Sequence, residues 1–342
     1  SSWEKAFHTI QKALSAVPDD KGGHCILIRP DTYAEAMLDP AHKGAKGAYN
    51  LLVGDFDGRL GSGAKGWVVV DSGAPLVALR RGPSQFEIDP SGDPAKQTGL
   101  KCIDWYGPWR CEPGFSGVVW DRWIFRHIYG TGSEGGIGWD MSCQGGCEFS
   151  AVVEDCVGIG RFAGAAVMAH VARKDEPVVF RRSYFMNLDW WGDAGGVYVR
   201  GANRSAPDYP DAIFDDCTII GPDNALNVAW GGVDTNYTRV KFKNCRLIVL
   251  NFSQPHGTPS SGIIYCASKE GKQLHVDLED CLLAGFKVFG TLRGEISYTT
   301  KGKCRAYVQF QQPVPAGFER LRFFPTELFD QLAPPQLHGT LR

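Results

Sequence analysis

Residues 240–249 read VKFKNCRLIV, an alternation of apolar and polar side chains that is typical of a strand but is interrupted by an Asn-Cys pair. An Asp-Cys pair interrupts the same alternation in AVVEDCVGI, AIFDDCTII and VDLEDCLLA, and VVFRRSYFM carries Arg-Ser in that place. The small residue of each pair stands at positions 156, 183, 217, 245 and 281, so the spacings are 27, 34, 28 and 36 residues.

A repeat of roughly 30 residues with loops of variable length is typical of a solenoid. Each unit has a strand before the pair, a strand after it, a variable loop, and a third strand of the kind SGIIYCA. Three strands and three corners per unit predict an all-β parallel β-helix.

The Asp or Asn of each pair suits a tight corner, because these residues tolerate a left-handed backbone and bond to neighbouring main chain. Stacked coils lie about 4.8 Å apart, and we expect the residue after the bend to pack inward. The repeated cysteines are therefore expected to be free thiols that pack as small hydrophobic residues. The remaining candidates for disulfide bonds are Cys102 with Cys111 and Cys143 with Cys147.

The chain resembles the right-handed parallel β-helix, or pectin-lyase-like, proteins of the polysaccharide lyase type. Residues 7–38, FHTIQKALSAVPDDKGGHCILIRPDTYAEAML, are similar to the opening of that family: a short capping helix, then Ile26, Ile28, Pro30 and Tyr33 in an I-x-I-x-P-x-x-Tyr pattern. The resemblance implies one β-helix domain over residues 1–310, with an N-terminal cap at about 3–17. Residues 311–342 leave the pattern and are expected to cap the coil or pack along it.

The resemblance also implies that a site lies on the sheet that follows the long loop. Its expected strands are GIGWDMS, AVMAHVA, GVYVRGA, ALNVAWG and GIIYCAS. The alternation of apolar and polar residues in these strands predicts which side chains point into the core: Val167, Val197, Leu226, Ile263, Ala169, Val199, Val228 and Tyr265. It places on the outer face Gly138, Met168, Tyr198, Asn227, Ile264, Asp140, His170, Arg200, Ala229 and Cys266.

Asp140, His170 and Arg200 are 30 residues apart in turn, which predicts one row on three neighbouring coils. Elimination across a uronic acid needs a clamp for the carboxylate, a base and an acid. Arg200 is expected to hold the carboxylate, and His170, oriented by Asp140, to be the base. Tyr198 is a candidate base or acid. The alternative is an exposed ladder of ion pairs without a function.

The loop before Arg200, NLDWWGDAGG, holds candidates for substrate binding. Trp190 and Trp191 suit stacking on sugar rings, with the alternative that they cover the core. Asp189 and Asp193 are candidates to hold calcium or to act as acid and base. Asn227 and His256 complete the expected substrate-binding set, and no other cofactor is expected.

The charge and hydropathy of the chain narrow its partners. A net charge of -2 gives no reason to expect a nucleic acid, and no apolar run is long enough for a membrane span. The first residues, SSWEKAF, read as a mature or trimmed terminus. We expect a secreted or periplasmic protein, and we expect it to be a monomer. The expected function is cleavage of a uronic-acid-containing polysaccharide by lyase β-elimination. Alternatives are a hydrolase or epimerase in the same groove, or a non-catalytic carbohydrate-binding protein.

Overall fold

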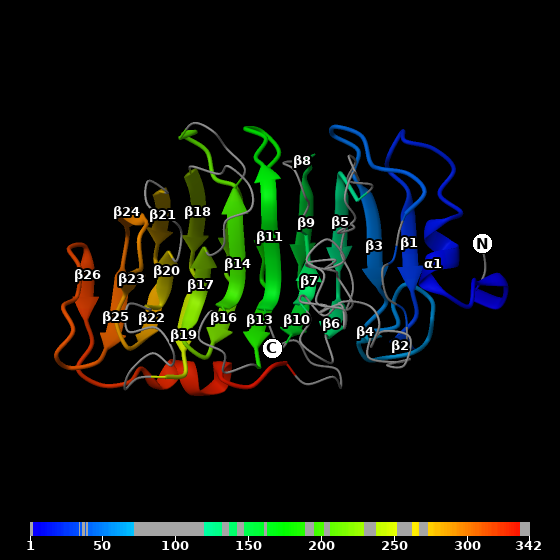
Figure 1. Ribbon diagram of the computed structural model, residues 1–342. Helices are drawn as coiled ribbons and strands as arrows, with labels where there is room; N and C mark the ends of the chain where they lie inside the picture. The colour runs from blue at the N-terminus through cyan, green and yellow to red at the C-terminus, as the bar shows by residue number, and fades with distance from the viewer. Residues whose placement is uncertain are drawn as a thin grey trace, which may run out of the picture.

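The computed structural model describes residues 3–33, 35, 38, 40–71, 120–131, 137–141, 147–160, 163–188, 195–201, 206–228, 237–251, 262–266 and 273–335. In this part of the chain, short strands stack side by side into an elongated solenoid (Figure 1). Three parallel sheets run along it, and each sheet receives strands from successive coils.

The strands of the first sheet are, in spatial order, β1 (Cys25–Ile28), β3 (Asn50–Gly54), β5 (Trp123–Arg126), β9 (Ala151–Glu154), β12 (Val178–Arg181), β15 (Ala212–Asp215), β18 (Tyr237–Lys243), β21 (Gln273–Glu279) and β24 (Glu295–Lys301). Those of the second sheet are β2 (Asp31–Tyr33), β4 (Val68–Asp71), β6 (Ile128–Thr131), β10 (Val157–Gly160), β13 (Tyr184–Asn187), β16 (Thr218–Gly221), β19 (Arg246–Val249), β22 (Leu282–Gly285), β25 (Cys304–Val308) and β26 (Phe318–Arg320).

The third sheet contains β7 (Ile137–Asp140), β11 (Ala163–Val171), β14 (Gly195–Gly201), β17 (Asn224–Val228), β20 (Ile264–Cys266) and β23 (Phe289–Thr291), and the short β8 (Cys147–Glu148) pairs with β11. One coil runs from the first sheet through a tight corner into the second, on to the third, and back by a loop, as β15, β16 and β17 do. This order confirms the all-β, right-handed parallel β-helix predicted from the sequence.

The corner between the first and second sheets has a left-handed backbone in coil after coil. The angle φ at the first residue of the pair is 53° at Asp155, 46° at Arg182, 54° at Asp216, 51° at Asn244 and 52° at Asp280. The structure therefore confirms the left-handed conformation predicted for these Asp and Asn residues. Arg182 adopts it as well, although arginine has no intrinsic preference for it.

The second residue of each pair points inward and closes the corner with a hydrogen bond. The Cys245 thiol donates to the carbonyl oxygen of Lys243 at 3.2 Å, and the Ser183 hydroxyl donates to that of Arg181 at 2.8 Å. The same bond, to the carbonyl two residues earlier, is made by Cys156, Cys217 and Cys281. The expected inward packing is confirmed, because these four thiols are at most 1% exposed and are free.

The interior is filled by side chains that repeat at the same level of each coil. Phe180, Phe214 and Phe242 lie level on β12, β15 and β18. Their rings stack with centroids 4.7 and 5.2 Å apart. The core is therefore a continuous column, which each coil extends.

The outer face of the first sheet carries a row of charges that alternate in sign. The row, one residue per strand, is Arg126, Glu154, Arg181, Asp215, Lys243, Glu279 and Lys301. Glu154 is buried, with its side chain 6% exposed, and contacts Arg126, Arg181 and Arg182. Opposite charges level with one another favour this register over a slipped one.

Both ends of the coil are covered. The predicted N-terminal helix is α1 (Ile10–Leu14), preceded by a 3-10 helix (Trp3–Lys5). Ile10 and Leu14 pack into the core. None of the described helices is long and apolar enough to cross a membrane.

Residues 309–335 close the C-terminal end and then return along the second sheet. Phe318 packs beside Tyr298, with ring centroids 6.2 Å apart. The following segment, which includes the 3-10 helix Thr326–Gln331, runs beneath the strands of the second sheet (Figure 1). Leu328 is buried there in an apolar cluster on the outer face of that sheet. The second sheet is therefore covered over its C-terminal coils.

The corner thiols are expected to be unreactive in the folded protein. Burial raises the pKa of Cys156, Cys245 and Cys281 well above the ordinary value of a thiol, so little reactive thiolate forms. A thiol reagent at mildly alkaline pH should label the exposed Cys25 but not these three until urea is added, as peptide mapping by mass spectrometry will show. Native labelling of Cys245 at the rate of Cys25 would mean that the corner faces outward.

The charge row is expected to contribute to stability through its buried member. Glu154→Gln removes the charge that three arginines share, so we expect a loss of about 2 kcal/mol in the free energy of unfolding, measured in urea. Glu295→Gln changes an exposed acid on β24 and should alter stability by less than about 0.5 kcal/mol. Equal effects of the two substitutions would show that the row is only a solvated surface.

Candidate functional site

The alternation of β14, GGVYVRG, positions the central residues of the candidate site. Val197 and Val199 point into the core and are at most 1% exposed. Tyr198 and Arg200 lie between and beyond them and therefore face outward, as predicted. The neighbouring β17 is aligned so that Val197 is level with Leu226 and Tyr198 with Asn227.

A row of polar side chains crosses the outer face of the third sheet. Tyr198, Asn227 and Tyr265 stand level on β14, β17 and β20. The Asn227 side-chain amide donates to the Tyr198 hydroxyl oxygen at 3.3 Å. The three residues are at most 2% exposed although they stand on the outside of the sheet. They form a desolvated set of hydrogen-bonding groups, in which each bond is stronger than it would be in water.

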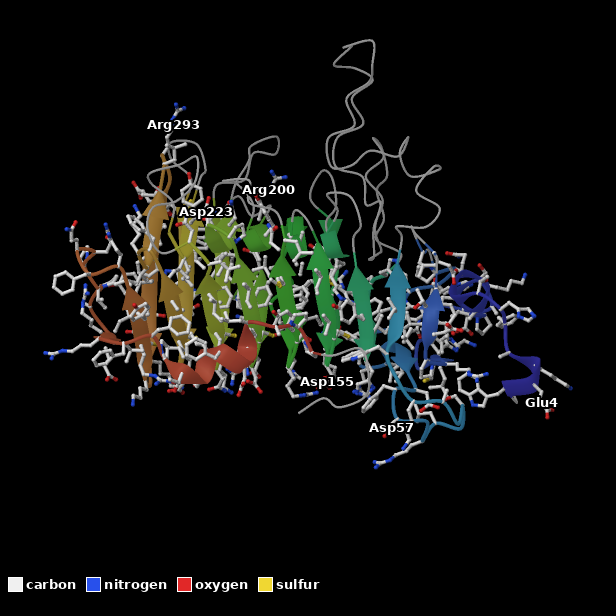
Figure 2. All side chains as sticks on the ribbon, turned by 90° about the horizontal axis from the view of Figure 1, so that it is seen from below. Glu4, Asp57, Asp155, Arg200, Asp223 and Arg293 are labelled. Atoms are coloured by element: carbon white, nitrogen blue, oxygen red, sulfur yellow. The ribbon has the colours of Figure 1, made fainter. Side chains whose placement is uncertain are left out.

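Arg200 lies next to this row, two residues beyond Tyr198, and is level with Met168. It is only partly buried, and it projects from the same side of the solenoid as Asp223 (Figure 2). A guanidinium at the edge of a polar, water-poor face suits a planar anion such as a carboxylate.

The predicted row of Asp140, His170 and Arg200 is wrong in register. The three residues do lie on neighbouring strands, β7, β11 and β14. However, Asp140 is level with Ala166 and hence with Tyr198, whereas His170 follows a register shift and is level with Gly201. The side chains of Asp140 and His170 lie outside the described part, so the correction concerns their backbone positions.

The shift has a physical cause in β11. Its first residues, Ala163 to Ala166, are all small and carry no alternation, so the pattern of residues 166–172 did not reveal that the strand begins earlier. A bulge between Met168 and His170 then moves the last residues by one position.

The sequence also placed the residues of β20 on the wrong faces. Ile264 and Cys266 belong to the core, and Tyr265, which was expected inside, is level with Asn227 on the outer face. Ile263 and Ile264 are both apolar, so alternation could not choose between two registers that differ by one residue. Tyr265 is therefore a member of the site that sequence reasoning missed.

Asp223 lies at the edge of the same sheet, just before β17. It is 2% exposed and accepts a hydrogen bond at 3.1 Å from the side-chain amide of Asn251, one coil further on. Among the described residues no group of three or more acidic, histidine or cysteine side chains could hold a metal ion. The neighbour described at Asp223 is thus an amide rather than one of the clustered carboxylates that calcium prefers.

The remaining candidates fall outside the described residues. They are the loop residues Asp189, Trp190, Trp191, Asp193 and His256, together with Cys102, Cys111 and Cys143 of the expected disulfides.

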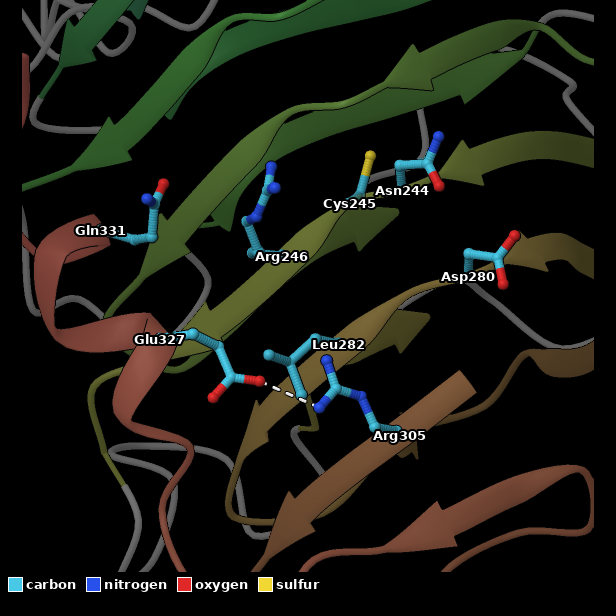
Figure 3. A pocket seen from close by; sticks show the side chains of 8 residues that line it. All are labelled: Asn244, Cys245, Arg246, Asp280, Leu282, Arg305, Glu327 and Gln331. Atoms are coloured by element: carbon cyan, nitrogen blue, oxygen red, sulfur yellow. Dashed lines mark hydrogen bonds and ion pairs between the residues drawn. The ribbon is translucent and has the colours of Figure 1, made fainter. Parts of the chain in front are cut away.

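A cavity of about 370 Å³ lies elsewhere, between the second sheet and the C-terminal 3-10 helix (Figure 3). Both of its arginines are already paired: Arg305 contacts Glu327 at 2.9 Å, and Arg246 contacts Asp216 at 2.7 Å. Asp280 accepts a hydrogen bond from the backbone N–H of Lys303 at 2.7 Å. Since these pairs hold the C-terminal segment and the corner row, we regard this cavity as structural.

Comparisons with known proteins bear on the fold alone. The sequence matches no protein-family model and no curated protein. Among solved structures, the chain is similar to the crystal structure of the pectate lyase Pel9A, with 12% identity, a TM-score of 0.47, and coverage of 91% of this chain and 68% of that one. The strand order and register described above identify the chain as a right-handed parallel β-helix protein.

Proposed function

We propose that the protein binds and cleaves an acidic polysaccharide on the outer face of the third sheet by β-elimination. The observation that carries the proposal is the position of Arg200, a partly buried guanidinium at the edge of the row formed by Tyr198, Asn227 and Tyr265. Neutral donors and acceptors suit sugar hydroxyls, and one adjacent cation suits the carboxylate of a uronic acid.

Elimination requires three functions, and the described side chains suggest two of them. Arg200 neutralises the carboxylate, which makes the neighbouring C–H proton easier to remove. Tyr198 then protonates the leaving sugar oxygen. Because the Asn227 amide donates to the Tyr198 oxygen, the phenol can use its own O–H as a donor.

His170 remains our proposed base. It lies on β11, beside β14, and Asp140 lies on β7, the next strand on the same side. Asp140 stands level with Ala166, four residues before His170, which at about 3.3 Å per residue is too far for a direct hydrogen bond, so Asp140 is not proposed to orient His170. Trp190, Trp191 and His256 are proposed to bind further sugar rings. No step is assigned to calcium, for which only Asp189 and Asp193 remain as candidate ligands.

We also propose that the protein is a monomer that acts outside the cell, where such polymers occur. The seven described free cysteines are compatible with this, because six of them are buried and shielded from oxidants.

The test is to incubate the protein with a panel of acidic polysaccharides and follow the ultraviolet absorbance of the unsaturated product. Assays with added calcium and with a chelator separate a metal-dependent reaction from a metal-independent one. We expect Arg200→Ala to lower the rate at least about 100-fold, because it removes a charge that stabilises the transition state. Its thermal stability should stay near that of the parent protein.

Arg246→Ala serves as the matched control, since it removes an arginine from the second sheet and should leave the rate unchanged. New reducing ends without absorbance would show that the protein is a hydrolase rather than a lyase. Inversion of the uronic acid without chain cleavage would show that it is an epimerase. Binding without any product would indicate a carbohydrate-binding protein. An equal loss of activity in both arginine variants would remove Arg200 from the site.

A further inference from the structure

A second cluster of reactive side chains lies on a different face, at the C-terminal end of the first sheet. His275 and Asp277 point outward from β21, and Ser297 points outward from β24 directly beside His275. The Ser297 hydroxyl is 2.8 Å from Nδ1 of His275, and Nε2 of His275 is 3.2 Å from Oδ1 of Asp277. A hydroxyl, an imidazole and a carboxylate are thus connected in series.

The hydrogen bonds determine which nitrogen of His275 carries the proton. An ionised carboxylate can only accept, so Nε2 must donate to Asp277. In the neutral ring Nδ1 then presents its lone pair to Ser297, and the hydroxyl donates to it. This is the polarity in which a histidine can remove the proton of a serine.

Asp277 is held firmly in its ionised form. Arg239 donates to both of its oxygens, from Nε to Oδ2 at 2.7 Å and from a terminal nitrogen to Oδ1 at 3.1 Å. The Thr299 hydroxyl also donates to Oδ1, at 2.6 Å. Burial opposes ionisation of Asp277, but the bonds from Arg239 and Thr299 outweigh it and lower the pKa of the carboxyl group. The imidazole therefore faces a fixed negative charge that can stabilise it when it becomes protonated.

Ser297 is exposed, and its strand is the last of the first sheet. The backbone carbonyl oxygen of Lys301 in β24 accepts from the N–H of Asp280, so the backbone of Lys301 faces β21. Every second residue of a strand faces the same neighbour, and the backbone groups of Thr299, Ser297 and Glu295 therefore face β21 as well. The alternate residues direct theirs away from β21, toward the C-terminal edge of the sheet. The N–H of Tyr298, next in the chain to Ser297, is one of these and is a candidate donor to a developing oxyanion.

We propose that Ser297, His275 and Asp277 form a second reactive site, a nucleophilic serine that hydrolyses esters of short acyl groups. The open face of a sheet suits a short acyl group presented at the surface, whereas a long chain would need a pocket. The site shares no residue with the face that carries Arg200. A test of this site is therefore independent of the proposed cleavage of polysaccharide.

The reaction balances with water as the only co-reactant. Oγ of Ser297 bonds to the acyl carbon while its proton passes to Nδ1 of His275. The bond from that carbon to the alcohol oxygen breaks, and the alcohol leaves with the proton from His275. Water then bonds to the acyl carbon while one of its protons passes to Nδ1 of His275. The bond from that carbon to Oγ of Ser297 breaks, His275 returns the proton to Oγ, and the acid leaves.

The experiment is covalent labelling of the whole protein with a fluorophosphonate, which reacts with activated serines, followed by peptide mapping. Ser15 is the internal control: it is also exposed, but its hydroxyl bonds to the backbone oxygen of Gln11 rather than to a histidine. We expect Ser297 to be labelled at least about 100-fold faster than Ser15, because a positioned general base contributes roughly 10²–10⁴-fold.

His275→Gln tests the base without removing a side chain from the row. This variant should lose the fast labelling of Ser297 and the hydrolysis of p-nitrophenyl acetate together. The melting temperature should change little, because His275 points outward from β21 and is not part of the hydrophobic core. Equal labelling of Ser297 and Ser15, or fast labelling of Ser297 that survives His275→Gln, would overturn the proposal and leave an ordinary hydrogen-bonded ladder.

Discussion

Five consecutive coils of this solenoid depend on a residue with left-handed backbone followed by a small side chain that donates to the carbonyl two residues earlier. The left-handed conformation costs an L-residue about 1–2 kcal/mol, and one net hydrogen bond returns about 1 kcal/mol. The remainder is offset because the ladder passes through the corner unbroken. The N–H of Asn244 donates to the Glu279 oxygen, and the N–H of Leu282 donates to that of Cys245. The chain can therefore change direction without leaving a buried backbone group unpaired.

The small residue has to satisfy two requirements at once. It must donate a hydrogen bond over a short reach, and it must pack in an apolar interior beside its counterpart in the next coil. Cysteine meets both at 156, 217, 245 and 281, and serine meets the first at 183. The backbone of Cys156 compensates for the polarity of Ser183, because its N–H donates to the serine hydroxyl at 3.1 Å. This local rule explains why the recurrence of one short sequence pattern at five positions predicted the fold.

The third sheet was harder to predict because its register is not local. Its strands are separated from the corners by loops of variable length, so sequence spacing does not determine which residues stand level. Asp140 and His170 are 30 residues apart yet lie at different levels, because β11 begins with four small residues and contains a bulge. Tyr198 and Asn227 were aligned correctly, since Val197, Val199, Leu226 and Val228 give their strands a clear alternation. Burial of the outer polar row was not predictable either, because polar residues that alternate with apolar ones resemble an exposed face.

The outer faces of the three sheets differ in the contacts that their side chains make. On the first sheet, the charges of one strand are neutralised by those of the next, and over its C-terminal coils the second sheet is covered by the chain's own C-terminal segment. The third sheet instead buries phenols and an amide, which is unfavourable unless they are hydrogen-bonded. A row that served stability alone would be better filled by apolar residues, so its polarity favours a role in binding. His275 and Ser297 are a second such case. The neighbouring row on the same sheet consists of alternating charges, whereas this position holds a neutral serine beside a histidine. In both places, parallel register brings together side chains from separate coils, and a slip of one residue, as at Tyr265, decides which side chain stands on the outer face of the sheet.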